Sequence, residues 1–268
     1  MKKQKITWTK FVLFGLLAAA LVMCRVAGQE LPEPGEERAD LKGTRTAAQK
    51  AAAGPVRGAR PENPAGDAET VPVERYVSPI DFDALRAENP DIYAWLEIPD
   101  TGVQAPVCFR KGDNTFYLDH DSSRASSGSG AVFTEDYNKT DFSDPVTVIY
   151  GHNSSLDGDF ACLQTEFSGL DRLRVHSRLN LYLPEKEKHY RIFAAVPFSN
   201  IHLLYYYPFS SEKVFRGFFS LVFSIRSIAA VTDTAAGPEP GDSVVILSTC
   251  LDGDSSQRFL VMAKESED

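Results

Sequence analysis

The stretch SVVILSTCLDGDSSQRFLVMAKE, residues 243–265, contains two apolar runs separated by a short acidic segment. Aliphatic runs on both sides of a cluster of Asp, Gly and Ser are typical of two strands joined by a turn. We expect the two runs to form an antiparallel hairpin. Because the first run ends on Cys250 and the second opens on Arg258, this hairpin would place a thiol across from a guanidinium at the rim of a sheet.

The rest of the chain from about Tyr76 onward is also rich in short β-like runs. A short helix capped by Asp81 leads into a strand that carries Trp95, Leu96 and Ile98. The further runs are APVCF, NTFYLDH, GSGAVFTED, PVTVIYGHN, RLNLYLP and HYRIFAAVPF. This many short strands at close spacing predict a β-barrel or a β-sandwich.

One segment, residues 211–230, breaks this rhythm. Its apolar residues recur at helical spacing and form one stripe: Phe215, Phe218, Phe219, Val222 and Ala229. We interpret it as a helix that covers the core and is inserted before the last two strands.

Length and composition restrict the class of protein. The chain has 268 residues, of which 43% are hydrophobic, and this allows one sizeable domain with accessory segments. The net charge of -9, with no basic run beyond the N-terminus, argues against nucleic acid as a partner. The four cysteines form no CxxC pair and have no histidine at metal spacing, so no metal site is predicted.

The first 75 residues differ from the rest in composition. Residues 1–28 start with basic residues and continue in an apolar run, Phe11–Cys24, which predicts an export signal or a membrane anchor. The length of the run leaves a cleaved signal peptide and an uncleaved anchor both open. Residues 29–75 are rich in Ala, Pro and Gly, which predicts a disordered stalk. Residues 76–268 form the expected folded domain, outside the cytoplasm because basic flanks stay inside.

Cys250 and His152 are the candidates for nucleophile and base. A thiol at the end of a buried strand can be reached by substrate, although a buried structural cysteine is the alternative interpretation. A nucleophilic thiol needs a base or a positive charge nearby. Among the five histidines, His152 alone follows a strongly β-branched strand, PVTVIYG, which would bring its imidazole to the rim. A surface histidine held by hydrogen bonds is the alternative.

Arg258 is the candidate for stabilising negative charge. Its planar fork of donors can hold an oxyanion, whereas an arginine paired with Asp252 or Asp254 at a sheet edge would have no such role. Asp252, two residues after the thiol, could instead orient His152. Thiol, imidazole and guanidinium together are suited to acyl transfer.

Longer segments around these residues resemble the sortases of class B. The similarity lies in LSTC at Cys250, YGHN at His152 and RFLVMAK at Arg258, together with NPDIYAWLEIPDTGVQAPV, DNTFYLDHD, SGAVFTEDYN and YGHNSSLDGDFACL. The resemblance covers roughly residues 76–264. It implies an eight-stranded closed β-barrel with N-terminal helices and an inserted helix before the last two strands.

The resemblance also implies the reaction, which is cysteine transpeptidation without a metal or organic cofactor. Cys250 would attack a threonine carbonyl in a C-terminal sorting signal, His152 would transfer protons, and Arg258 would stabilise the oxyanion. Ser248, Thr249 and Asp252 occupy positions that in the family lie near the substrate.

The implied partners follow from this reaction. They are exported proteins that bear a sorting signal and an acceptor amine of a cell-wall precursor or a pilin. The family is usually held by an uncleaved N-terminal anchor, with the N-terminus in the cytoplasm and the catalytic domain outside a Gram-positive membrane. A cysteine peptidase that hydrolyses its acyl-enzyme and a non-catalytic surface-binding module remain the alternatives.

Overall fold

A computed structural model of the chain describes residues 76–153 and 160–267. The expected signal or anchor and the expected stalk, residues 1–75, lie outside the described residues. In the described part, no helix has the length and apolar character needed to cross a membrane.

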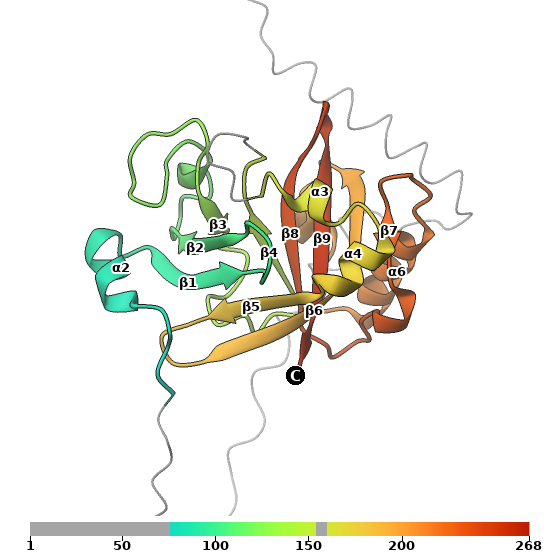
Figure 1. Ribbon diagram of the computed structural model, residues 1–268, viewed down its shortest axis with the longest axis horizontal. Helices are drawn as coiled ribbons and strands as arrows, with labels where there is room; N and C mark the ends of the chain where they lie inside the picture. The colour runs from blue at the N-terminus through green and yellow to red at the C-terminus, as the bar shows by residue number, and fades with distance from the viewer. Residues whose placement is uncertain (1–75, 154–159, 268) are drawn as a thin grey trace, which may run out of the picture. The chain divides into compact units, whose positions relative to one another are not determined.

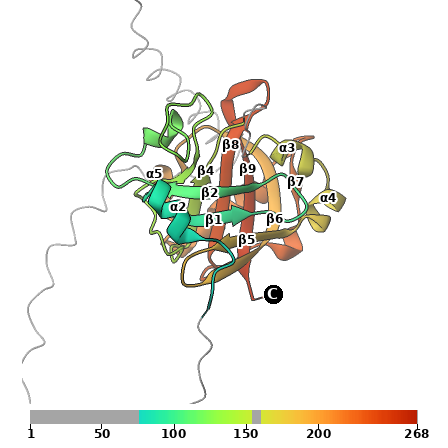
Figure 2. The same cartoon turned by 60° about the vertical axis from the view of Figure 1, so that its left-hand side comes forward.

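The described strands form one sheet that closes on itself (Figure 1). Their order is β5-β1-β2-β3-β4-β8-β9-β6-β7, and an additional pairing of β5 with β6 closes an eight-stranded barrel that leaves β7 outside. Figure 2 shows β1, β2 and β5 crossing in front of the long strands β8 and β9. The predicted eight-stranded barrel is confirmed. The strands are β1 (Ile92–Glu97), β2 (Gln104–Phe109), β3 (Val132–Thr134), β4 (Val146–Tyr150), β5 (Arg178–Tyr182), β6 (Glu187–Ser199), β7 (Val231–Thr232), β8 (Val244–Leu251) and β9 (Asp254–Ser266).

Several short helices and one longer helix pack against this barrel. They are α2 (Phe82–Glu88), α3 (Leu163–Glu166), α4 (Leu170–Val175), α5 (Leu203–Tyr206) and α6 (Glu212–Ser224), with short 3-10 turns η1 (Phe116–Leu118) and η2 (Thr234–Ala236). Of the expected N-terminal helices, α2 is the one that falls in the described residues. The side chain of Asp81 caps it by accepting a hydrogen bond from Ala84 N at 2.9 Å, as predicted.

Strand β8 separates two cores by the alternation of its side chains. Val245 and Leu247 belong to the cluster inside the barrel, whereas Val244 and Ile246 point outward into a second cluster. The inserted helix α6 covers this outer face with its buried side chains, Phe215, Phe218, Phe219 and Val222. Burying each of these side chains contributes about 1.5–3 kcal/mol to the free energy of folding. The outer face of β8 therefore has a hydrophobic core of its own.

The inserted helix is shorter than the sequence predicted. It ends at Ser224, and Ala229 therefore lies beyond it. Ile225 already has an extended backbone, with φ -60° and ψ 127°. The guanidinium of Arg226 donates to the carbonyls of Phe223 and Ile225, which satisfies groups that a further helical turn would have bonded.

One expected strand is not a strand. The run NTFYLDH contains η1 instead, and the prediction was wrong there. The carboxylate of Asp113 accepts hydrogen bonds from the backbone N and the hydroxyl of Thr115, and Leu118 N then bonds to Thr115 O. This local side-chain bonding starts a turn that competes with strand pairing.

Candidate active site

Strand β8 delivers Cys250 to the rim on the outer face of the barrel. Because side chains alternate, Ser248 and Cys250 share the face of Ile246, and Thr249 shares the inner face of Leu247. Cys250 is exposed, whereas Ser248 and Thr249 are buried. Of the two neighbours expected near the substrate, only Ser248 therefore lies on the face of the thiol.

Arg258 lies directly across from Cys250. The two residues are register partners in the antiparallel β8–β9 pair, which confirms the predicted hairpin. The hairpin turns at Asp252 and Gly253, where Gly253 adopts a left-handed φ of 77°. The register shifts between Cys250 and Leu251, so the pair stands just before a β-bulge.

His152 reaches the same rim from the neighbouring strand. The parallel β4–β8 ladder ends with Tyr150 opposite Ser248, and Gly151 N still bonds to Ser248 O at 3.1 Å. Two residues further along, the same register brings His152 beside Cys250 on the outer face. Arg258 and Cys250 thus lie on paired strands, and His152 follows the end of the next strand at the same rim.

The hydrogen bond of His152 fixes its neutral tautomer. Its Nε2 lies 3.0 Å from the carbonyl oxygen of Leu118, which can only accept, so Nε2 carries the proton. Nδ1 is then the basic nitrogen. The other four histidines, His120, His176, His189 and His202, each lie within ion-pair distance of a carboxylate.

Two amide side chains hold the turn that follows the thiol. Asn153 Nδ2 donates to the carbonyl of Cys250 at 3.1 Å and to Oδ1 of Asp252 at 2.5 Å. Gln164, on α3, donates to the same Cys250 carbonyl at 3.4 Å, and its Oε1 accepts from Asp252 N at 3.1 Å. In the structure, the carboxylate of Asp252 accepts a hydrogen bond from Asn153. The imidazole of His152, which Asp252 was expected to orient, is hydrogen-bonded to the carbonyl of Leu118.

Tyr150 lies opposite Ser248, two residues before the thiol in the register of β4 and β8. Burial raises the pKa of its phenol, the nearby Glu135 carboxylate raises it further, and the positive charge of Arg258 acts in the opposite direction. The phenol therefore stays neutral. Because Arg258 and Cys250 are cross-strand partners, their side chains start on the same face of the sheet.

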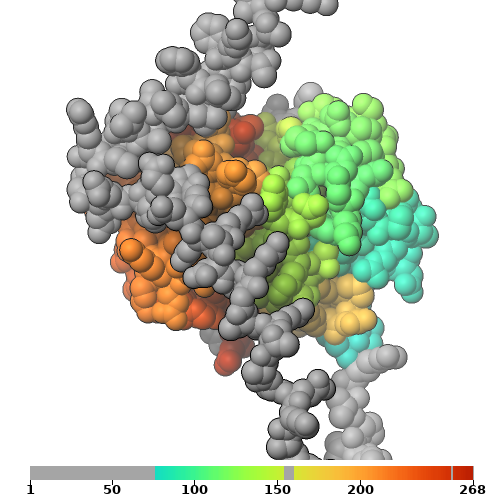
Figure 3. All heavy atoms as spheres, turned by 180° about the vertical axis from the view of Figure 1, so that it is seen from behind, coloured from blue at the N-terminus to red at the C-terminus, as the bar shows by residue number. Residues whose placement is uncertain are grey.

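His202, in the segment before α6, contacts Glu135, the carboxylate that acts on Tyr150. Its Nε2 lies 2.7 Å from Oε2 of Glu135, and its Nδ1 accepts from Tyr205 N at 3.2 Å, which caps α5. Figure 3 shows this side of the molecule, with the orange atoms around α5 and α6 and the green atoms of the η1 and β3 region on its two sides. The ion pair of His202 thus ties the start of α5 to Glu135, just after β3.

Gly130 packs against the imidazole of His152. A Cβ at this position would lie 2.5 Å from the carbonyl oxygen of Tyr117 and 2.8 Å from Cδ2 of His152, and the residue has a φ of +59°. The carbonyl belongs to the backbone and cannot move aside cheaply. Only glycine fits here without displacing the histidine.

We expect Gly130→Ala to lower the free energy of unfolding by about 1–3 kcal/mol, because it adds overpacking to left-handed strain. Thermal unfolding followed by circular dichroism measures this loss. Gly128→Ala is the matched control, because a Cβ there meets nothing within 4 Å. Equal unfolding temperatures for the two variants would contradict the close contact.

Comparisons with known proteins agree with this architecture. No family model matches the chain. Sortase B of Listeria monocytogenes is 36% identical over 80 residues, which are 30% of this chain and 32% of that protein, so the match spans about a third of the curated relative.

Solved structures match over a larger part of the chain. Sortase B of Clostridium perfringens is 26% identical with a TM-score of 0.58, covering 69% of this chain and 99% of that one. Sortase B of Staphylococcus aureus is 21% identical with a TM-score of 0.61, covering 72% and 89%, and shows the same fold. The chain is therefore similar to sortase B in sequence over part of its length, and it shares the fold of the solved sortase B structures.

Proposed function

We propose that the chain is a cysteine transpeptidase. The observation that carries the proposal is the pairing of Arg258 with Cys250 on adjacent strands, with His152 just beyond the end of the next strand. These groups supply a nucleophile, a proton carrier and a donor fork to one reacting carbonyl. One of the similar solved structures is a complex of S. aureus sortase B with a substrate, which supports the general class.

The first half of the reaction breaks a peptide bond. The Cys250 thiolate attacks the backbone carbonyl carbon, and the guanidinium of Arg258 stabilises the oxyanion that forms. When the C–N bond breaks, the leaving amine takes a proton from Nδ1 of the His152 imidazolium. Nε2 keeps its hydrogen bond to Leu118 throughout. The product is a thioacyl-enzyme.

The second half forms a new amide bond. An incoming amine attacks the thioacyl carbon and loses its proton to Nδ1 of His152, and the thiolate of Cys250 leaves. One amide bond is broken and one is made, with no net oxidation. We propose exported proteins with a C-terminal sorting signal as acyl donors, and a cell-wall precursor or a pilin as the amine. The place of action would be the outer face of the membrane, with residues 1–28 as the anchor.

Hydrolysis is the second candidate outcome, and the exposure of Cys250 favours it. Water reaches an exposed thiol, so a thioacyl group there is open to attack when no amine is present. Hydrolysis would make the protein a cysteine peptidase with the same first step. The ratio of ligated to hydrolysed product separates the two activities.

Mass spectrometry of the full chain with a set of sorting-signal peptides tests the proposal. We expect a thioacyl adduct on Cys250 that converts to a ligated peptide when triglycine is added. Cys250→Ala should form no adduct, whereas Cys162→Ala should behave like the unchanged protein, because the Cys162 thiol is half-buried and burial raises its pKa. Hydrolysis alone with every amine tried would show a peptidase. No adduct with any peptide would favour a surface-binding module.

A further inference from the structure

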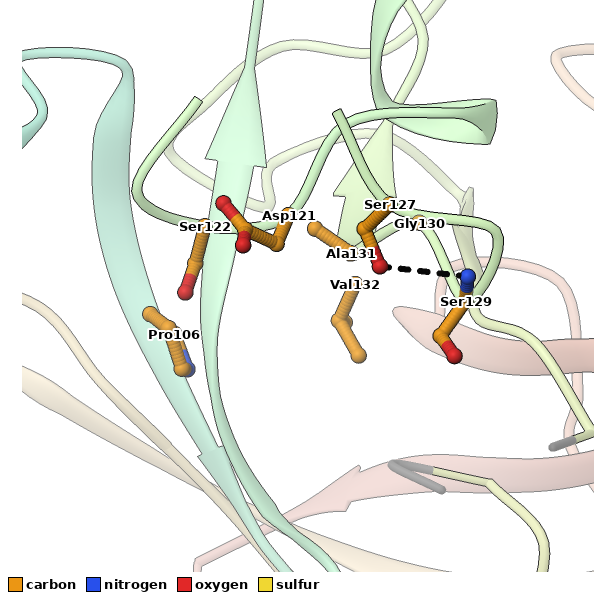
Figure 4. Close-up of a pocket in the computed structure, with 8 residues that line it drawn as sticks. All are labelled: Pro106, Asp121, Ser122, Ser127, Ser129, Gly130, Ala131 and Val132. Atoms are coloured by element: carbon orange, nitrogen blue, oxygen red, sulfur yellow. Dashed lines mark hydrogen bonds between the residues drawn. The ribbon is translucent and has the colours of Figure 1, made fainter. Parts of the chain in front are cut away.

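A cavity of about 320 Å³ lies beside the candidate active site. Its size is at the lower end for pockets that bind small molecules. Figure 4 shows its lining, with Asp121 and Ser122 on one side and Ser127, Ser129 and Gly130 on the other. Pro106 of β2 and Val132 of β3 complete it together with Ala131.

The strand registers place this cavity in line with the reacting groups. Val107 of β2 pairs with Val132, so Pro106 lies opposite Ala131 one step earlier. Phe133 pairs with Tyr150, so the antiparallel register brings Ala131 beside His152 two steps further. The order along the rim is therefore Arg258, Cys250, His152 and then the cavity. Neighbouring strands lie about 4.8 Å apart, so the cavity begins about one strand beyond the imidazole.

Gly130 is a direct link between the cavity and His152. It lines the cavity and also touches the Nε2–Cδ2 edge of the imidazole, where even a methyl group would collide with the ring. At this point Gly130 separates the cavity from the imidazole of His152. A chain that leaves the cavity along this rim reaches His152 before it reaches Cys250.

The lining suits a polar chain with a positive charge. Of the eight described lining residues, Asp121 alone is charged, and three of the others are serines. A hydrogen bond from the Ser123 hydroxyl lowers the pKa of the Asp121 carboxyl, so it remains a carboxylate. The nearby cation Arg124 is drawn away by an ion pair of 2.8 Å with Asp91. An ammonium group is attracted to such a site, and a carboxylate or a phosphate is repelled.

We propose that this cavity binds the amine-bearing peptide that accepts the acyl group, an inference that rests on the proposed transpeptidase function. Arg258 holds the oxyanion on one side of Cys250, so the amine must approach from the other side, where the base Nδ1 of His152 lies. The cavity is a polar hollow on that side. Its small residues and hydroxyl groups fit a chain of small residues with a free amine.

Filling the cavity tests this assignment. Ser122→Trp projects an indole into the cavity, while the Ser122 backbone carbonyl can keep its hydrogen bond from Asn89. Ser126→Trp is the matched control, because Ser126 is exposed on the same loop and is not part of the lining. The rate of thioacyl formation without amine and the KM for triglycine are measured separately for each variant.

We expect Ser122→Trp to raise the triglycine KM about tenfold or more, with thioacyl formation changed less than about twofold. Ser126→Trp should alter neither. An unchanged KM in Ser122→Trp, or the same increase in both variants, would overturn the assignment. Asp121→Asn provides a second variant that retains an Oδ1 acceptor for Ser123 and Ala125, and it should also raise this KM.

A binding measurement tests the amine site independently of the acyl-transfer reaction. Triglycine is titrated into the full-length Cys250→Ala protein, and the backbone amide signals of Ser127 and Gly130 are followed by NMR. Saturable shifts that disappear in Cys250→Ala/Ser122→Trp support an amine site even if no peptide acylates the enzyme. Their absence overturns the site, whereas a missing thioacyl adduct in the unchanged protein overturns the proposed function instead.

Discussion

Arg258→Lys should lower kcat/KM for peptide cleavage by about 10²–10³, which is the loss typical for removal of one oxyanion donor. Arg258 stands opposite Cys250 in the hairpin register, so its side chain begins at the rim beside the thiol. A lysine keeps the charge but presents it at one point on a flexible stem. The loss should therefore appear in kcat, because the interaction is made mainly in the transition state.

Two measurements separate this role from others. The alkylation rate of Cys250 by iodoacetamide reports the thiolate, and we expect it to change less than cleavage does. Arg191→Lys is the matched control, because Arg191 is an exposed residue of strand β6 and lies outside the site. Near-normal cleavage by Arg258→Lys would remove Arg258 from the oxyanion role.

His152→Gln should lower the rate of peptide cleavage by about 10²–10⁴, the range for loss of a general acid or base. The amide of glutamine can still donate to the Leu118 carbonyl in place of Nε2, so the fold of the rim is retained. It cannot give a proton to the leaving amine. Cleavage is measured with a quenched fluorescent peptide, and folding is checked by thermal unfolding.

A thioester of the same acyl peptide provides the control for His152. A thiolate can leave without a proton, whereas an amine cannot, because the reference pKa of a thiol is only about 8.5. The variant should therefore lose much less activity with the thioester than with the peptide. Equal losses on the two substrates would show that His152 serves to position groups and not to transfer protons.

The hairpin of β8 and β9 could be predicted from the sequence because its information is local. Two apolar runs and a short acidic turn determine which residues pair, and Cys250 indeed faces Arg258. The α6 helix could be predicted for the same reason, since its stripe of phenylalanines fits a helical period. Its end could not, because the bonds of Arg226 to nearby carbonyls depend on a side-chain conformation.

The contacts around His152 could not be predicted from periodicity. The strand pattern of PVTVIYG placed the imidazole at a rim, but its partner is a backbone carbonyl at Leu118, in a segment that was expected to be a strand. The hydrogen bonds that Asn153 and Gln164 donate to the carbonyl of Cys250 were not predicted either. The position of Asn153 directly after His152 was the one indication in the sequence that it lies at the site. The contact of Gln164 depends on how α3 lies against the β8–β9 turn, which no local pattern indicates.

The parallel pairing of β4 with β8 has a consequence for how the protein matures. Asn153 and the carbonyl of Cys250 that it bonds are 97 positions apart in the chain. Contacts between such distant segments form late, because the entropy of closing the intervening loop must be overcome first. The β8–β9 hairpin can form early from neighbouring residues, but the imidazole reaches the thiol only when the barrel closes. A partly folded chain would therefore lack the assembled site, and the proposed acyl transfer would require the completed barrel.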